Sequence, residues 1–394
     1  MVDSRRLGRP VCRQKLNIKT ISAASCTKQK LSYSGRRNHM KWPDHGGQPH
    51  KLRSDLQIEF SGMLDFSANI NPLGPPGWLL KKAEEALKNM SVYPDPEYPE
   101  AVRSVSEAEG VENGQVLITN GGAEAVYLAA RLVSGGTALL IEPSFKEYSR
   151  ACRHYNIRME YIPYRADFTF PYEETKEKLS EVDALFICRP HNPSGTVIPY
   201  EMICRLAEDT ARHNVRLFID EAFIDFLPAE KKLTGLIQKY SHIVLLRSLT
   251  KIFSVPGLRS GYLIGGKNDT AFLKKEQIAW SVNTVSAALI PPMMQDEDFV
   301  SRTVLWLHQE IKWIESRLDH DRWHMSRTHT NFYLLSDRRM EDQEPLIHFL
   351  LKEGIAVRHT YNFSGIDGKA VRAAVRSRSE NEKLMKALEK WEGR

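Results

Sequence analysis

The sequence predicts an α/β protein, with a large domain built on a mainly parallel sheet flanked by helices and a smaller α+β domain at the C-terminal end. From about residue 115 onward, short apolar segments alternate with longer amphipathic ones, which is typical of strands joined by crossover helices. The length of 394 residues exceeds that of one ordinary domain. Hydrophobic residues make up 42% of the chain and charged residues 26%, which is enough apolar material for a large core.

We expect four parts along the chain. Residues 1–40 lack apolar periodicity and are expected to form a basic disordered tail. Residues 41–85 are rich in Pro and Gly and are expected to pack on the small domain. Residues 86–295 would form the large domain and residues 296–394 the small one.

The individual elements follow from local hydrophobic patterns. Short apolar runs predict six strands in the large domain: Val116–Thr119, Ala138–Ile141, Ala184–Cys188, Leu217–Ile219, Ile243–Leu246 and Tyr262–Ile264. Amphipathic spacing predicts helices between them, including Ala123–Leu132, Phe145–Tyr155 and Tyr200–His213. The C-terminal part is expected to hold a long helix, three strands and a closing helix: Phe299–Leu318, Phe332–Leu335, Ala356–Arg358, Val371–Val375 and Glu380–Trp391.

The charge distribution argues against a nucleic-acid-binding surface as the main function. The net charge is +6, but residues 1–40 hold ten Lys/Arg and one Asp, whereas the remainder holds 45 basic and 48 acidic residues. No apolar run approaches the roughly 20 residues of a membrane span, so no membrane partner is expected. The basic tail is interpreted as a solvated extension, an addition upstream of a start at Met40, or a transit peptide.

The five cysteines show no spacing typical of a metal site or of a redox pair. They are Cys12, Cys26, Cys152, Cys188 and Cys204. We therefore expect reduced, packed thiols, no metal, and a cytoplasmic location.

Chemistry-bearing residues follow several of the predicted strands, at the edge of the sheet where ligands of such folds bind. Gly122 and Ala123 open a helix, where free backbone amides favour an anion, although such a motif alone is more often a simple tight turn. Phe145 could stack on a flat ring or serve only as a core residue. Asn192 could hydrogen-bond a ring hydroxyl or belong to an ordinary turn.

The next two strand ends carry charged groups. Asp220 ends a buried strand, where an acid is costly unless it meets a cation such as a protonated ring nitrogen. Lys251 could supply an amine that attacks an aldehyde. Ser248 and Arg259 lie three residues before and eight after it and can donate to a phosphate.

Taken together, these strand ends supply each need of one cofactor: phosphate, ring face, ring hydroxyl, ring nitrogen and aldehyde. The set resembles fold-type I pyridoxal-phosphate enzymes of the histidinol-phosphate aminotransferase-like family over residues 41–394. The resemblance implies a covalent bond from Lys251 to pyridoxal 5'-phosphate, with Asp220 on the ring nitrogen and Asn192 on the ring hydroxyl. It also implies that Phe145 lies on the ring face. The implied phosphate ligands are Gly122, Ala123, Ser248 and Arg259.

Tyr93 resembles the tyrosine that reaches the cofactor phosphate of a neighbouring subunit, which implies a homodimer. Other segments resemble the threonine-phosphate decarboxylases of cobalamin biosynthesis: His45–Gly47, Asp65–Gly74, Asp220–Phe226, Arg247–Gly261 and Trp280–Asn283. These decarboxylate L-threonine O-3-phosphate to (R)-1-aminopropan-2-yl phosphate. Phe223 stands where the related aminotransferases usually carry tyrosine, which favours a decarboxylase (a lyase).

A doubly anionic substrate requires at least two anion-binding sites. The substrate-binding candidates are His45, Asn69, Asn71, Arg358 and Arg372. Three alternatives stay open. The chain could be an aminotransferase such as histidinol-phosphate aminotransferase, a decarboxylase of serine phosphate, or a non-catalytic protein on the same fold.

Overall fold

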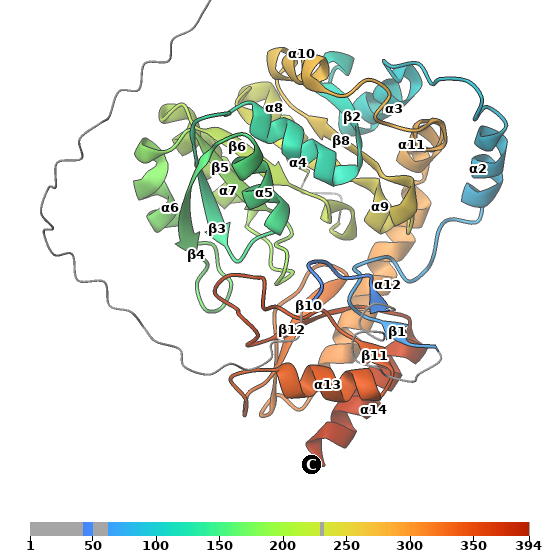
Figure 1. The fold of residues 1–394 in the computed structure, drawn as a ribbon, viewed down its shortest axis with the longest axis vertical. Coiled ribbons are helices and arrows are strands. Elements are labelled where there is room, and N and C mark those ends of the chain that lie inside the picture. Colours follow the sequence, from blue (N-terminus) through green and yellow to red (C-terminus); the bar gives the residue numbers. More distant parts are fainter. Residues whose placement is uncertain (1–41, 50–61, 229–231, 394) are drawn as a thin grey trace, which may run out of the picture. The chain divides into compact units, whose positions relative to one another are not determined.

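The computed structural model describes residues 42–49, 62–228 and 232–393 (Figure 1). Its main feature is a sheet of seven strands in the order β2-β8-β7-β6-β5-β3-β4. The strands are β2 Val116–Asn120, β3 Thr137–Glu142, β4 Arg158–Pro163, β5 Ala184–Cys188, β6 Arg216–Asp220, β7 Ile243–Ser248 and β8 Ser260–Ile264. Within this sheet β8 alone runs in the direction opposite to the other strands, so the sheet is mainly parallel as predicted.

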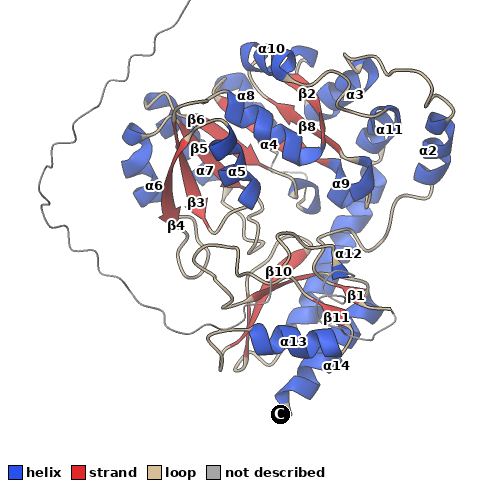
Figure 2. Cartoon of the chain, viewed as in Figure 1, coloured by secondary structure: helices blue, strands red, loops and turns tan. Residues whose placement is uncertain are grey.

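Both faces of the sheet are buried, because its central strands are apolar at successive positions. On β6, Phe218 belongs to one core cluster, whereas Leu217 and Ile219 belong to the other. Strands of this kind need helices on both sides, since each face must be removed from water. Figure 2 shows these helices around the sheet.

One core cluster includes α4 Gly121–Arg131 and α5 Lys146–His154. The other includes α3 Pro99–Glu109, α7 Tyr200–Arg212, α8 Thr234–Lys239 and α11 Thr284–Gln295. The remaining helices associated with this sheet are α2 Leu79–Leu87, α6 Tyr172–Lys178, α9 Leu249–Ile252 and α10 Lys267–Glu276. We call the seven-stranded sheet with these helices the large lobe.

Strand β4 was not predicted from the sequence. It lies at the edge of the sheet, where it pairs with β3, and most of its side chains are partly or fully exposed. An edge strand needs no continuous apolar run, because one side and part of each face contact water. Because β4 contains several polar residues, it lacks the continuous apolar run by which the other strands were predicted.

The long helix α12 Glu297–Glu315 leads to a second group of elements, which we call the small lobe. Its antiparallel sheet has the order β12-β10-β9, with strands Val371–Ala374, Phe332–Asp337 and Trp323–Met325. Helices α13 Glu344–Lys352 and α14 Arg378–Glu392 pack on each other beside it. Strand β1 Leu64–Asp65 pairs in parallel with β11 Ile355–Ala356, which attaches the N-terminal segment to this lobe.

The predicted strand at residues 356–358 is shorter than expected. Only Ile355 and Ala356 are in a strand, while Arg358 forms an isolated antiparallel bridge with Arg372. The two arginines are therefore neighbours on adjacent backbones. No helix in the described ranges is both long and apolar enough to cross a membrane.

Candidate active site

A cavity of about 510 Å³ lies between the strand ends of the large lobe and segments near residues 44–47, 67–70 and 358–372. Twelve of the fourteen predicted site residues line it. They are His45, Asn69, Gly122, Ala123, Phe145, Asn192, Asp220, Ser248, Lys251, Arg259, Arg358 and Arg372. Two predicted residues, Asn71 and Tyr93, do not line it.

An anion cradle forms where β2 passes directly into α4. Gly121 has a φ of +75°, which favours glycine, and the guanidinium of Arg259 lies beside its Cα atom. Gly122 faces Ser248, whose hydroxyl lies 2.9 Å from that of Thr250. The first backbone amides of a helix have no partner within the helix and carry its positive end. Together with these hydroxyls and the guanidinium, they suit a phosphate.

At the end of β6, Asp220 presents a buried carboxylate to the cavity. Its Oδ2 accepts a hydrogen bond from the hydroxyl of Tyr148 at 2.6 Å, and its Oδ1 accepts one from the backbone N–H of Ala222 at 2.9 Å. Burial raises the pKa of Asp220, and these two donors oppose the increase. Among the described residues Asp220 forms no ion pair, so its carboxylate is available to pair with a cationic ring nitrogen in the cavity.

Lys251 lies on α9, just after β7. Burial, together with the positive charges of Arg372 and Arg259, lowers the pKa of its amine to about 8. A lysine with such a pKa has a substantial neutral fraction near neutral pH, which nucleophilic attack on an aldehyde requires.

Asn71 fixes the segment that carries Lys251 and does not face the cavity. Its backbone N–H donates to the carbonyl of Lys251 at 3.1 Å, and its Nδ2 donates to the carbonyl of Ile252 at 2.8 Å. Nδ2 also donates to Thr303 Oγ1 at 3.1 Å. This geometry does not support direct contact between Asn71 and a substrate, because its amide is committed to the chain.

Arg358 and Arg372 place two buried guanidinium groups on the small-lobe side of the cavity. Arg372 donates to Asn192 Oδ1 at 2.6 Å and to the carbonyl of Ser67 at 3.2 Å. Arg358 donates to the carbonyl of Asp44 at 2.7 Å. Burial lowers the pKa of Arg372 to about 9 and that of Arg358 to about 10. In the described part of the chain neither guanidinium pairs with a carboxylate, so an anion would find both available.

Residues 44–47 line the cavity, and the segment 42–47 contacts both lobes. Asp44 pairs with Lys146 and Arg150 of α5, at 2.5 and 3.0 Å. His45 Nε2 lies 3.3 Å from Glu147 Oε1, and mainly burial lowers the pKa of His45. A Cβ atom on Gly46 would lie 2.0 Å from the carbonyl oxygen of Ser67, so glycine is needed for this close approach.

Asn69 supplies a further polar group at the cavity. Its side chain is buried, and its Oδ1 has no hydrogen-bond partner within the described ranges. Such an acceptor is costly to bury alone, so a donor on a bound molecule would relieve it.

Tyr93 lies outside the cavity and is 78% exposed. Its ring packs against Trp280 with ring centroids 5.0 Å apart. The structure therefore leaves its predicted contact with a cofactor in a second subunit as a prediction.

Sequence reasoning missed Tyr148 and Thr250. Tyr148 lies three residues after Phe145, in the first turn of α5, and the rings of the two residues contact each other with centroids 5.8 Å apart. That spacing was the available signal, but the partner of Tyr148, Asp220, lies 72 positions away. Thr250 lies within the segment Ser248–Lys251 and lines the cavity, but no role was predicted for it.

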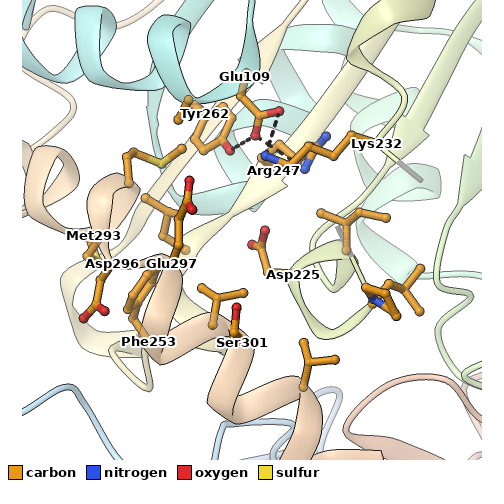
Figure 3. A pocket seen from close by; sticks show the side chains of 18 of the residues that line it. Glu109, Asp225, Lys232, Arg247, Phe253, Tyr262, Met293, Asp296, Glu297 and Ser301 are labelled. Atoms are coloured by element: carbon orange, nitrogen blue, oxygen red, sulfur yellow. Dashed lines mark hydrogen bonds and ion pairs between the residues drawn. The ribbon is translucent and has the colours of Figure 1, made fainter. Parts of the chain in front are cut away.

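A second cavity of about 460 Å³ is lined by residues that include Arg247, near the carboxyl end of β7, and Leu249, the first residue of α9 (Figure 3). Arg247 is buried there, 2.9 Å from Glu221 and 3.6 Å from Glu109. The hydroxyl of Tyr262 donates to Glu109 at 2.7 Å. None of the predicted site residues lines this cavity. Through Arg247 this cavity is linked to the proposed site, because its ion-pair partner Glu221 directly follows Asp220.

The fold and the cavity define a class of α/β enzymes in which a lysine at a strand end faces an anion cradle and a buried acid. The chain belongs to the aminotransferase class I and II family, whose model matches residues 61–388.

Individual relatives agree with this family. A threonine-phosphate decarboxylase of Salmonella typhimurium is 32% identical over 87% of this chain and 95% of that protein. The adenosylcobalamin biosynthesis bifunctional protein CobDQ of Leptospira interrogans is 28% identical over 89% of this chain and 41% of that protein. The crystal structure of histidinol-phosphate aminotransferase from Clostridium acetobutylicum has a TM-score of 0.80 and 30% identity, and covers 84% of this chain and 99% of that one.

Proposed function

We propose that this chain is a pyridoxal-phosphate-dependent decarboxylase that converts L-threonine O-3-phosphate to (R)-1-aminopropan-2-yl phosphate for cobalamin biosynthesis. The observation that carries the proposal is the pair of buried guanidiniums, Arg358 and Arg372, beside Lys251 and Asp220 in one cavity. The names of the Salmonella and Leptospira relatives support the same assignment.

The donor set of the cavity fits the cofactor. In this assignment Lys251 holds the aldehyde carbon, Asp220 the ring nitrogen and Asn192 the ring hydroxyl, while Phe145 covers the ring. The phosphate would lie on the cradle of Gly122, Ala123, Ser248 and Arg259. When bound, the cofactor supplies an electron sink for the bond that breaks at the alpha carbon.

The substrate would be held by its two anionic groups. Hydrogen bonds orient the guanidiniums of Arg372 and Arg358, but neither pairs with a carboxylate in the described part of the chain. Each can therefore bind a carboxylate or a phosphate of the substrate. His45 and Asn69 line the same cavity and can add donors. Transfer of the substrate carboxylate and phosphate from water into the cavity is favourable only if they pair with buried cations that have no other anionic partner.

Anion placement also decides which reaction occurs. The bond that breaks at the alpha carbon is the one held perpendicular to the cofactor ring. Decarboxylation therefore requires that the arginines hold the substrate carboxylate out of the ring plane.

Phe223 lines the cavity and is the residue that argues against amino transfer. Its ring meets Phe332 edge to face, with centroids 4.8 Å apart. A phenyl ring there offers no hydroxyl to the ring oxygen of the cofactor. The second candidate function is histidinol-phosphate amino transfer, which is favoured by the similarity to the clostridial aminotransferase.

We further propose a cytoplasmic homodimer in which Tyr93 contacts the cofactor phosphate of the partner. Apolar side chains near Tyr93 in the sequence or in space are exposed, as a covered surface in a dimer would require: Met90, Val92, Ile278 and Trp280. Cys152, Cys188 and Cys204 are free thiols, as expected in a reducing compartment. The division into tail, N-terminal segment, large domain and small domain remains part of the proposal.

The test is a substrate panel with purified protein and added cofactor. Incubation with O-phospho-L-threonine, without any 2-oxo acid, should release carbon dioxide and form 1-aminopropan-2-yl phosphate. O-phospho-L-serine differs by one methyl group and should react about 10- to 200-fold less efficiently. Amino transfer from glutamate to imidazole-acetol phosphate, with no carbon dioxide released, would replace this proposal with the second candidate.

A further inference from the structure

Asp220 depends on one neighbouring side chain that no part of the proposed reaction assigns. The hydroxyl of Tyr148 donates to its Oδ2 at 2.6 Å, and both side chains are buried. The other carboxylate oxygen accepts only the N–H of Ala222, among the hydrogen bonds of the described residues. Tyr148 is thus the single side-chain donor to this carboxylate in that part of the chain.

The ring of Tyr148 is fixed by its neighbours. It lies on Phe186, with ring centroids 5.7 Å apart, and edge-on to Phe145 at 5.8 Å. Phe145 immediately precedes α5 in an extended conformation, and Tyr148 lies in the first turn of this helix, so the two residues flank the start of α5. A movement of this turn would displace the proposed ring-face residue and the donor to Asp220 together.

The protonation states of the surrounding groups make Tyr148 a permanent donor. Burial raises the pKa of Tyr148 well above its usual value, and the charge of Asp220 adds to the increase. Cys188 of β5 also faces Asp220, and burial raises the pKa of its thiol, which donates to the carbonyl of Pro190 at 3.1 Å. Both groups therefore stay protonated and neutral beside the carboxylate.

The other charged groups nearby do not stabilise Asp220. Glu221 is directed away from the cavity, where it pairs with Arg189 and Arg247. Lys251 lines the same cavity from α9 but forms no ion pair with Asp220 in the described structure. Before a ligand binds, the charge of Asp220 is therefore stabilised by the hydroxyl of Tyr148 and one backbone amide.

We propose that Tyr148 is a positioning residue, which holds Asp220 ionised and oriented so that its carboxylate pairs with the ring nitrogen of the cofactor. The inference rests on the proposed cofactor site and adds to it the group that prepares the acid for binding. Its role is exerted entirely through Asp220, because Tyr148 itself does not line the cavity.

The test measures binding of pyridoxine 5'-phosphate to the cofactor-free protein by quenching of tryptophan fluorescence. This probe has the same ring and phosphate as the proposed cofactor but no aldehyde, so covalent capture by Lys251 does not contribute. Tyr148→Phe should weaken binding about 10- to 100-fold, as expected for loss of a hydrogen bond to a charged group. The matched control is Tyr333→Phe. Tyr333 is buried in β10, and its hydroxyl has no hydrogen-bond partner within the described ranges.

The pH dependence separates this role from a merely structural one. Because the hydroxyl of Tyr148 lowers the pKa of Asp220, its removal raises that pKa. As the pH falls from about 8 to 5, the Tyr148→Phe protein should therefore lose affinity at a higher pH than the wild type. Titration of the probe is the same for all variants and does not alter the comparison.

A double-mutant cycle with Asp220→Asn completes the test. In the Asp220→Asn background, Tyr148→Phe should produce no further loss, because the carboxylate on which it acts is absent. An equal loss in both backgrounds, or wild-type affinity in Tyr148→Phe, would overturn the inference. If the wild-type protein binds neither the probe nor pyridoxal 5'-phosphate, the proposed function fails, and the inference fails with it.

Discussion

Replacement of Arg372 by glutamine should change two measurable properties, because this guanidinium faces both the proposed substrate and Lys251. The side chain is buried, and its pKa is lowered to about 9 mainly because burial penalises its charge. A buried cation of this kind gains most when an anion binds beside it. Loss of hydrogen bonds between charged partners typically costs about 1.5–3 kcal/mol. We therefore expect kcat/KM for O-phospho-L-threonine to fall by about 10- to 150-fold.

The second effect is on Lys251. Its pKa of about 8 is lowered first by burial, then by the charge of Arg372, and then by that of Arg259. At pH 7 a lysine with this pKa is neutral in about one-tenth of the molecules, compared with less than about 0.1% for an ordinary lysine. Removal of the charge of Arg372 raises the pKa of Lys251, and each unit of increase in that pKa lowers the neutral fraction at pH 7 about tenfold, equivalent to about 1.4 kcal/mol.

The assay is the rate at which the apoprotein captures pyridoxal 5'-phosphate, followed by stopped-flow absorbance as a function of pH. The wild-type rate should rise with pH and level off above about pH 8. In Arg372→Gln the same rise should occur at higher pH. The control is Arg376→Gln, because Arg376 pairs with Glu380 on α14 at 2.8 Å and does not line the cavity. An unchanged pH profile together with an unchanged kcat/KM in Arg372→Gln would refute the reasoning.

Three further predictions follow from the same geometry. Lys251→Ala should remove the absorbance band of covalently bound cofactor, whereas an unchanged spectrum would exclude Lys251 as the attachment site. The Tyr93→Ala and Lys251→Ala proteins, each of low activity, should regain activity when they are mixed and exchange subunits. A mixed dimer then has one site with both wild-type residues. No recovery would contradict a contact of Tyr93 with the site of the partner subunit. Leu217→Ala should lower the free energy of unfolding by about 2–5 kcal/mol in chemical denaturation, because Leu217 is fully buried in the sheet. The control Leu80→Ala, at a side chain that is 67% exposed, should change it by less than about 0.5 kcal/mol.

The strands of the sheet interior could be predicted because burial on both faces leaves a plain signal in the sequence. Leu217 and Phe218 lie in different core clusters, so the strand that contains them must be apolar at successive positions. The predicted run at residues 184–188 matches the observed strand in both bounds. Edge strand β4 left no such signal, since Arg158 and Glu160 are exposed or half-buried.

The cofactor side of the site was predictable for a related reason: parallel strands place their carboxyl ends at one edge, so residues that follow successive strands converge. Asp220 and Lys251 do line one cavity. Contacts that depend on side-chain direction were not predictable. Asn71 appeared to be a substrate ligand, but its amide holds the backbone of α9. Tyr148 lies inside a predicted helix, and its partner Asp220 is 72 positions away, so only the fold reveals their hydrogen bond.

Buried charge is similarly hidden from sequence reasoning. Arg247 and Glu221 directly neighbour the predicted site residues Ser248 and Asp220 in the sequence. Their ion pair forms only because both side chains point to the same side of the sheet. The sequence of one strand shows that successive side chains point to opposite faces of the sheet. It does not show which side chains of two neighbouring strands will contact each other. The second cavity in Figure 3 was missed for this reason.

The most direct test of the proposed function follows the atoms of the substrate. The enzyme is incubated in D₂O with O-phospho-L-threonine that carries ¹³C in its carboxyl group, and the products are analysed by mass spectrometry and NMR. Decarboxylation predicts labelled carbon dioxide and 1-aminopropan-2-yl phosphate that keeps its original alpha hydrogen and gains one deuterium at the same carbon. Loss of the alpha hydrogen to solvent, with the labelled carboxyl group retained in a 2-oxo acid, would show amino transfer and contradict the account.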